Sequence, residues 1–209
     1  MRSDPGFRLL FITDRKLCRE DSLEYIIKSA CRHGVKAIQL REKDLLAKEL
    51  LNLAIRIRKI TNIYSSKLII NDRLDIALLS HADGLHCPQD GVSYKSVKKF
   101  NSKFLVGKSV HSIEEAFKAD KDGYDYLIFG PVFRTLSKIK YGKPTGLKEL
   151  YKVARSVKVP VYAIGGINPD RAKSCIANGA HGIAVVRFLM RADKIKKTID
   201  EFKIALGEL

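Results

Sequence analysis

The sequence predicts an α/β fold, a single small (β/α)8 TIM barrel that forms one domain over residues 1–209. Three observations support this fold class. Eight short apolar runs lack polar alternation, as strands do when both of their faces are covered. Stretches with the apolar period of a helix lie between the runs. Eight such units in 209 residues match the lower size limit of this barrel, about 200 residues. An open doubly wound sheet is the competing architecture, but it usually stops at five or six strands.

The predicted strands are rich in Ile, Leu and Val. In chain order they span residues 8–13, 36–40, 67–70, 83–86, 103–107, 125–129, 160–164 and 182–186. Two helical stripes between them are clear: Leu23, Ile26, Ile27 and Ala30 form one, and Leu46, Leu50, Leu53, Ile57 and Ile60 form the other. No Ser-, Gly- or Pro-rich linker interrupts this order, which supports one domain.

The N-terminal apolar stretch is too short for a secretory signal, and no run approaches the roughly 18 apolar residues of a membrane span. We therefore expect a cytoplasmic protein with no membrane partner. The cysteines are scattered without a C-x-x-C pair, so the pattern indicates neither a zinc site nor a disulfide framework. They are Cys18, Cys31, Cys87 and Cys175.

The formal net charge of +16 raises the question of a nucleic-acid partner, because a basic face is the footprint of phosphate-backbone binding. The lysines, however, alternate with Glu and Asp along the predicted helices, and no RNP, zinc-finger or recognition-helix pattern accompanies them. We expect no nucleic-acid partner. Part of the charge instead suits a positive mouth that gathers small phosphorylated substrates.

Reactive polar residues lie just past the ends of the apolar runs. In a parallel barrel these ends converge on one mouth, where such folds carry out chemistry. The pattern therefore predicts an enzyme. The residues concerned, with one pair of glycines among them, are Gln39, Arg41 and Lys43; Asn71 and Asp72; Ser109 and His111; Thr135, Ser137 and Lys138; Gly165 and Gly166; and Arg187.

An amide and two cations follow the second strand. Gln39, Arg41 and Lys43 are spaced by two, so in extended backbone their side chains leave the same face. This set suits a diphosphate, to which an arginine offers a bidentate fork. The alternative is that residues 41–44 form a surface charge cluster before a helix.

Asp72 follows the third strand. Its carboxylate, with substrate phosphates, would suit a hard cation such as Mg²⁺. Asp72 could instead cap the next helix.

Gly165 and Gly166 stand in one of the last two strand-to-helix loops, the usual phosphate site of this fold. Asn168 as helix cap and Pro169 at the first helical position would complete a helix end that favours an anion. The glycine pair could also be there for steric reasons alone.

His111 follows the fifth strand, where a histidine is a natural general acid or base near neutral pH. The alternative is that Ser112 caps the next helix and His111 only packs. His86 is a weaker candidate, and His33, His81 and His181 are expected to be structural, away from the mouth.

At several ordered blocks the chain resembles the thiamine phosphate synthases and their TenI-type relatives, the thiazole tautomerases. The blocks, which cover essentially the whole chain, are Gln39–Lys43, Ile70–Asp72, Ala82–His86, Gly107–Ser112, Phe129–Phe133 with Thr135 and Lys138, and Ala163–Ile167.

The resemblance implies a homodimer or other homo-oligomer of thiamine biosynthesis that joins hydroxymethylpyrimidine diphosphate to thiazole phosphate and releases diphosphate. It places the pyrimidine diphosphate against Gln39, Arg41, Lys43, Asn71, Ser109 and Lys138. It places the thiazole phosphate against Thr135, Ser137 and Gly166, to which we add Gly165, Val186 and Arg187. It also implies Mg²⁺ held by two aspartates, for which the sequence offers Asp72 and Asp90.

The chain departs from the synthase pattern near the metal. Arg73 replaces a second Asp, and Gly91 aligns with the second metal aspartate, which leaves Asp90 one position away. Arg187 replaces a phosphate-binding Ser.

Residues 109–112 resemble the TenI segment that carries an acid/base histidine. Two alternatives therefore stay open: a metal-free thiazole tautomerase in which His111 moves the proton, and a noncatalytic TenI-like regulator. We favour the synthase, because Gln39, Arg41, Lys43 and Lys138 have no evident purpose without a diphosphate.

Overall fold

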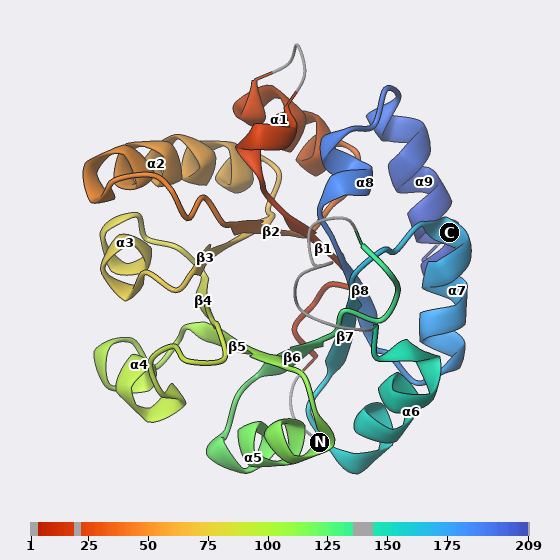
Figure 1. The fold of residues 1–209 in the computed structure, drawn as a ribbon. Coiled ribbons are helices and arrows are strands. Elements are labelled where there is room, and N and C mark those ends of the chain that lie inside the picture. The colour runs from red at the N-terminus through yellow and green to blue at the C-terminus, as the bar shows by residue number, and fades with distance from the viewer. Residues whose placement is uncertain (1–3, 19–21, 136–143, 209) are drawn as a thin grey trace.

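The structure, a computed structural model, describes residues 4–18, 22–135 and 144–208. Eight parallel strands close into a barrel in sequence order, with β1 paired to β8, and helices surround them in a ring (Figure 1). The predicted fold class is confirmed. The strands are β1 Leu9–Ile12, β2 Ala37–Leu40, β3 Lys67–Asn71, β4 Gly84–Cys87, β5 Leu105–Val110, β6 Tyr126–Phe129, β7 Val161–Ile164 and β8 Gly182–Val185. We call the end where the strands begin the base and the end where they finish the mouth.

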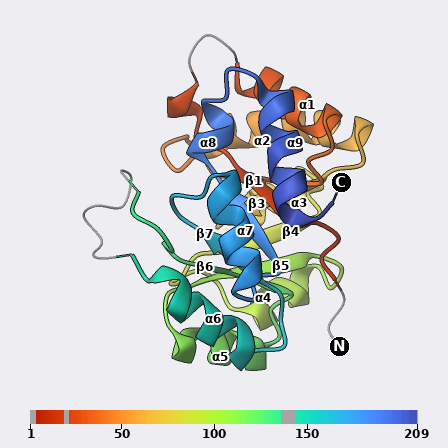
Figure 2. The same cartoon turned by 90° about the vertical axis from the view of Figure 1, so that its right-hand side faces the viewer.

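The helices are η1 Arg15–Leu17 (a 3₁₀ turn), α1 Leu23–Arg32, α2 Ala47–Ile63, α3 Leu74–Leu79, α4 Tyr94–Phe100, α5 Ile113–Asp122, α6 Gly146–Ser156, α7 Pro169–Ala177, α8 Arg187–Met190 and α9 Ile195–Leu206. On one side of the barrel α7 lies between α6 and α9 (Figure 2). No helix in the described part of the chain is long and apolar enough to cross a membrane.

The predicted helical stripes are largely confirmed. All four residues of the first stripe are buried in α1, and Leu50, Leu53 and Ile57 of the second are buried in α2. Leu46 is 73% exposed, because it precedes the helix as its N-cap and does not belong to the buried face.

The strand boundaries agree to within about two residues, except for β5, which continues to Val110. Gly107 and Lys108 pair with β4, and Ser109 pairs with Ile128 of β6. A glycine and two polar residues suggested the end of the run, yet the neighbouring strands hold the backbone extended. Ser109 therefore lies within the barrel wall.

Aromatic side chains fill the centre of the barrel. Tyr126 and Tyr162 are buried with ring centroids 5.6 Å apart in an edge arrangement, and Phe7 packs against both rings. A Cβ atom at Gly107 would overlap the Tyr126 ring. The glycine therefore makes room for the tyrosine, as close packing of an interior requires.

Paired charges and hydrogen bonds hold the base. Asp83 accepts a hydrogen bond from the backbone N–H of Leu68 at 2.7 Å and pairs with Arg58 of α2. Asp125 repeats this arrangement two strands later, where it accepts from the N–H of Val106 at 2.7 Å. Each carboxylate thus ties the strand that follows it to the strand before.

All four cysteines are free, with Cys31, Cys87 and Cys175 buried. Burial raises the pKa of Cys175 to about 12, so its thiol stays protonated at neutral pH.

Candidate active site at the barrel mouth

Gln39 is the innermost of the three polar residues predicted after strand β2. It lies in the strand, 1% exposed, and its amide nitrogen Nε2 has no hydrogen-bond partner among the described residues. An unpaired buried donor is costly and is often completed by a ligand. The strand ends at Leu40 and residues 43–44 form a turn, so the extended-backbone argument does not reach Lys43.

The two acidic residues of the 41–44 segment have structural partners. Glu42 is buried and accepts hydrogen bonds from the Thr13 hydroxyl at 2.6 Å and from the backbone N–H of Arg15 at 3.0 Å. Asp44 pairs with Arg15 at 2.6 Å and with Lys16 at 3.0 Å. The Arg15 guanidinium holds the pKa of Asp44 well below its usual range. These carboxylates join the loop after β2 to the loop after β1.

The two cations of the same segment differ. The half-buried Arg41 uses its backbone N–H to donate to Thr13 Oγ1 at 3.0 Å, and its guanidinium has no ion-pair or hydrogen-bond partner among the described residues. The exposed ammonium group of Lys43 likewise has none there. The surface-cluster alternative therefore describes Asp44, but not the buried Glu42 or the unpaired Arg41 and Lys43.

Asp72 is exposed in a left-handed conformation, with φ of 67°, directly after Asn71 of β3. The capping alternative is wrong, because Arg73 is the N-cap of α3 and no side chain caps the helix. Arg73 pairs with Asp75 at 2.5 Å, and the charge of Asp72 also acts on it. Asp72 keeps a carboxylate without a hydrogen-bond partner in the described part of the chain.

Asp90 is exposed in the turn after β4, beside the strand that precedes Asp72. Lys108 Nζ donates to the carbonyls of Pro88 at 2.9 Å and Gln89 at 2.8 Å and so holds that turn. No group of three or more His, Cys, Asp or Glu side chains that could hold a metal occurs among the described residues. Two carboxylates with substrate phosphates are a donor set that Mg²⁺ accepts, and Asp72 and Asp90 are exposed carboxylates that follow the adjacent strands β3 and β4.

His86 and Ser109 meet on neighbouring strands. His86 Nε2 lies 2.8 Å from Ser109 Oγ, and His86 Nδ1 lies 3.3 Å from the hydroxyl of Tyr126. Burial, and then the nearby charges of Lys108 and Arg41, lowers the pKa of His86 to about 3. The sequence analysis treated His86 as a weaker candidate. His86 is the next-to-last residue of β4 and lies opposite Gly107 of β5. The missed signal was the alternation of strand side chains, which puts His86 on the opposite face from Leu85 and Cys87.

His111 lies just past β5 with its ring held at the rim. Its Nδ1 is 2.6 Å from the carbonyl oxygen of Gly130. A carbonyl only accepts, so Nδ1 carries a hydrogen and Nε2 is left to exchange a proton. Ser112 does cap α5, by accepting from the N–H of Glu115 at 3.2 Å, but His111 is exposed. It therefore does not simply pack.

The Gly165–Gly166 turn after β7 packs tightly against the loop after β6. Phe133 N–H donates to the Gly165 carbonyl at 3.1 Å, and a Cβ at Gly166 would crowd the carbonyl of Arg134. The glycine pair thus has a steric role. The loop that packs against it also carries Thr135. Ser137 and Lys138, which follow in that loop, lie outside the described residues.

The helix end after this turn is formed as predicted. Asn168 Oδ1 accepts from the N–H of Arg171 at 2.9 Å and Pro169 is the first residue of α7. On the neighbouring strand, half-buried Val186 precedes α8, and exposed Arg187 begins it. The guanidinium of Arg187 has no ion-pair or hydrogen-bond partner within the described chain.

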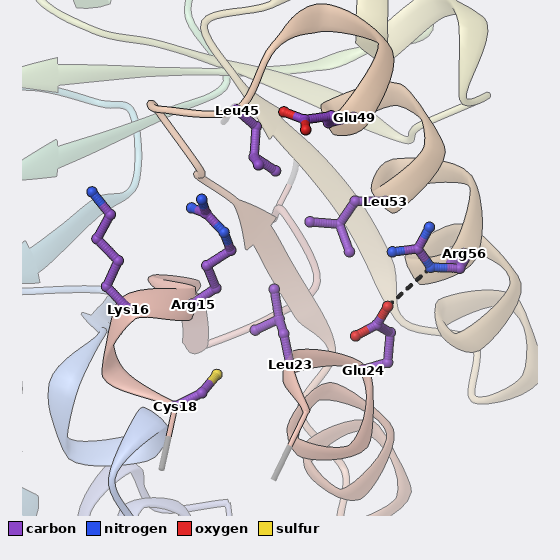
Figure 3. A pocket seen from close by; sticks show the side chains of 9 residues that line it. All are labelled: Arg15, Lys16, Cys18, Leu23, Glu24, Leu45, Glu49, Leu53 and Arg56. Atoms are coloured by element: carbon purple, nitrogen blue, oxygen red, sulfur yellow. Dashed lines mark hydrogen bonds and ion pairs between the residues drawn. The ribbon is translucent and has the colours of Figure 1, made fainter. Parts of the chain in front are cut away.

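A groove of about 510 Å³ lies outside the barrel, between η1, α1 and α2 (Figure 3). Its cations are already matched: Arg56 pairs with Glu24 at 2.9 Å, and Arg15 with Asp44. None of the predicted site residues lines it. The mouth, where cations and an amide lack partners, is therefore the candidate active site.

Comparison with known proteins agrees with this site. Residues 9–189 match the model of a family described as thiamine monophosphate synthase. The chain is similar to a putative thiamine-phosphate synthase 2 of Aquifex aeolicus, with 44% identity over 88% of this chain and 97% of that one. A thiamine-phosphate synthase of Pyrococcus furiosus is 36% identical over 97% of this chain and 96% of that one.

The structure is similar to that of a thiamine phosphate pyrophosphorylase from Pyrococcus furiosus, with a TM-score of 0.87 and 35% identity over 97% of this chain and 96% of that one. An (S)-3-O-geranylgeranylglyceryl phosphate synthase from Thermoplasma acidophilum, 15% identical with a TM-score of 0.69 over 98% and 95% of the two chains, shares the fold alone. The fold, the mouth and these matches confirm the resemblance: the chain belongs to the thiamine monophosphate synthase family.

Proposed function

We propose that this protein is a thiamine phosphate synthase, a transferase that joins hydroxymethylpyrimidine diphosphate to thiazole phosphate and releases diphosphate. The observation that carries the proposal, beside family membership, is the pair of cations at Arg41 and Lys43. Both charges lack a counter-charge in the described chain, although the two carboxylates between and after them are fully paired. A diphosphate would supply that counter-charge.

The pyrimidine diphosphate is assigned to one side of the mouth. Gln39 would donate its unpaired amide, Asn71 and Ser109 would position the substrate from the adjacent inward faces, and Lys138 would join the cations on the leaving group. The thiazole phosphate is assigned to the opposite side, where the loops after β6, β7 and β8 meet. Its proposed partners are Thr135, Ser137, Gly165, Gly166, Val186 and Arg187.

These residues favour a reaction in which the bond between the pyrimidine methylene and the diphosphate breaks and the thiazole nitrogen captures the methylene. Arg41, Lys43 and Lys138 would balance the charge that develops on the leaving diphosphate. This lowers the activation free energy of the reaction without a covalent step on the protein. Binding both substrates in one mouth aligns the nitrogen with the carbon, the proximity contribution to the rate.

We further propose that Asp72 and Asp90 hold Mg²⁺. When bound, the ion would neutralise part of the charge of the diphosphate. The exposed carboxylate of Asp72, which has no hydrogen-bond partner in the described part of the chain, supports this assignment. Lys108 supports the assignment of Asp90 indirectly, because its ammonium group holds the turn in which Asp90 lies.

Three other expectations stay predictions: one domain over residues 1–209, a homodimer or other homo-oligomer, and a cytoplasmic location. Small phosphorylated pyrimidine and thiazole compounds are the proposed partners, with neither nucleic acid nor membrane.

The test is thiamine phosphate formation from the two substrates by purified, folded protein, with Mg²⁺ and with a chelator. We expect product only with the metal. Product at the same rate in both conditions would remove the role of Asp72 and Asp90, and no product in either would remove the synthase assignment.

The second candidate is the thiazole tautomerase, and the geometry of His111 favours it. Because Nδ1 is fixed on the Gly130 carbonyl, Nε2 can take and return a proton at the mouth. A His111→Asn variant would retain a nitrogen near Nδ1 but no proton-transfer group. A tautomerase rate lost in this variant supports the second activity, whereas an unchanged rate excludes His111 as its acid/base.

A further inference from the structure

A buried polar chain lies beneath the mouth, and its members come from three adjacent strands. Tyr126 of β6, His86 of β4 and Ser109 of β5 are connected by contacts of 3.3 Å and 2.8 Å through the two nitrogens of the imidazole. His86 is 2% exposed and Tyr126 is fully buried. Ser109 is half-buried and forms the end of the chain that faces the mouth.

The protonation of this chain follows from its burial. His86 is buried and both of its ring nitrogens contact hydroxyl groups rather than a carboxylate, so burial favours the neutral ring with one N–H. Desolvation also raises the pKa of Tyr126 above its ordinary value, so the phenol keeps its hydrogen. Two directions of hydrogen bonding are then possible along the chain.

In the first direction Tyr126 donates to His86 Nδ1, and the Nε2–H donates to Ser109 Oγ. In the second, Ser109 donates to Nε2 and Nδ1–H donates to Tyr126. In the second direction the phenol oxygen accepts from Nδ1–H, and the hydrogen of the phenol then has no acceptor among the hydrogen bonds of the described residues, where His86 is its partner. In the first direction the phenol hydrogen of Tyr126 has His86 Nδ1 as its acceptor, so no buried donor of the chain is left unpaired.

The first direction has a consequence for Ser109. Its oxygen accepts from His86, so its hydrogen is free to point toward the mouth. We propose that His86 is a positioning residue that fixes Ser109 as a hydrogen-bond donor to the pyrimidine diphosphate. This inference rests on the proposed function, because it takes its substrate from there, and it assigns His86 no contact with the reacting atoms.

A matched pair of variants tests this role. The side-chain amide nitrogen of Gln can replace Nε2 of a histidine, whereas that of Asn replaces Nδ1. His86→Gln should therefore keep the donor to Ser109, and His86→Asn should lose it. We expect His86→Asn to raise KM for the pyrimidine diphosphate about tenfold, the size of one hydrogen bond to a charged group, with KM for thiazole phosphate unchanged. His86→Gln should stay within about threefold of the wild type by the same reasoning.

The double variant shows whether His86 acts through Ser109. If it does, His86→Asn combined with Ser109→Ala should be no worse than Ser109→Ala alone, because coupled residues are not additive. Multiplying effects, or equal effects of Asn and Gln at position 86, would overturn the proposal. If the His86 variants do not fold, Tyr126→Phe keeps the ring and removes the donor to Nδ1. It should raise the same KM, and an unchanged KM would count against the chain.

A measurement without turnover separates this inference from the proposed function. The ¹⁵N shifts of the His86 ring in the wild-type protein should show hydrogen on Nε2 and none on Nδ1, and hydrogen on Nδ1 would overturn the inference. If the wild-type protein makes no thiamine phosphate but shows the Nε2–H form, the proposed function fails while the orientation of Ser109 stands.

Discussion

The two ends of the barrel treat charge in opposite ways. At the base, Asp83 is paired with Arg58, and Asp125 is paired with Lys98 at 3.3 Å. These carboxylates hold strands in place. At the mouth, Arg41, Lys43 and Arg187 have no counter-charge in the described chain.

The loop after β2 contains both paired and unpaired charged residues. Glu42 and Asp44 fix the loop after β2 to Thr13, Arg15 and Lys16, as a residue at the base would. Arg41 and Lys43 alternate with them and stay unpaired. Unlike the many exposed lysines of this surface, Arg41 is half-buried, so a bound anion would supply a counter-charge that the fold itself does not.

The largest effect is expected at Arg41. Arg41→Ala should lower kcat/KM for thiamine phosphate formation by roughly 10²–10³-fold, as when one preorganised charge is removed from a transition state, and should leave the urea midpoint unchanged. Arg56→Ala, which breaks the outer pair with Glu24, is the matched control and should retain wild-type kinetics. If Arg41→Ala and Arg56→Ala have equal kinetics, the cation at the mouth has no greater role in the reaction than a paired cation on the outer surface.

Gly107→Ala should lower both the stability of the fold and the activity. A Cβ atom there overlaps the Tyr126 ring, and overpacking of this kind costs about 3 kcal/mol of unfolding free energy. Because Tyr126 also contacts His86, activity per folded molecule should fall too. Urea unfolding and steady-state kinetics on the same sample check this, and a stable, fully active variant would show that the tyrosine layer is not tightly packed.

Asp83→Ala should affect only the fold. It leaves the buried N–H of Leu68 and the guanidinium of Arg58 without their shared acceptor, at a cost of about 2 kcal/mol. A lower urea midpoint with unchanged kcat/KM is expected. Reduced kcat/KM in the folded variant would mean that the base is coupled to the chemistry.

The smallest effect belongs to Asp44. Its pKa is lowered by Arg15 and then Lys16, so its stabilising contribution is complete at neutral pH and declines as the pH falls below about 4. Wild type and Asp44→Asn should therefore differ slightly in urea midpoint at pH 7 and converge on acidification. A difference that grows toward low pH has the wrong sign for this ion pair.

Much of the barrel could be predicted from the sequence because buried parallel strands leave a local signature. Eight apolar runs and two helical stripes sufficed for the fold, and Asn168 and Pro169 for the start of α7. The position of polar residues after those runs was equally local. Arg41, Asp72 and His111 are all found at the mouth end for that reason.

What could not be predicted depends on contacts between distant segments. Glu42 and Arg41 are neighbours of similar polarity, and only the approach of Thr13 separates their roles. His86 gains its role from Ser109 and Tyr126, which are 23 and 40 residues away. Pairing across a barrel sets these relations, and no spacing within one segment records them.

Diphosphate binding is the most direct test of the claim that unpaired cations at the mouth hold an anion. Calorimetric titration of diphosphate with Mg²⁺ into the wild type, Arg41→Ala and Arg58→Ala separates mouth from base. We expect one bound diphosphate, an affinity lowered about 10- to 100-fold by Arg41→Ala, and no change with Arg58→Ala. Unchanged binding by Arg41→Ala, or an equal loss in both variants, would contradict the account.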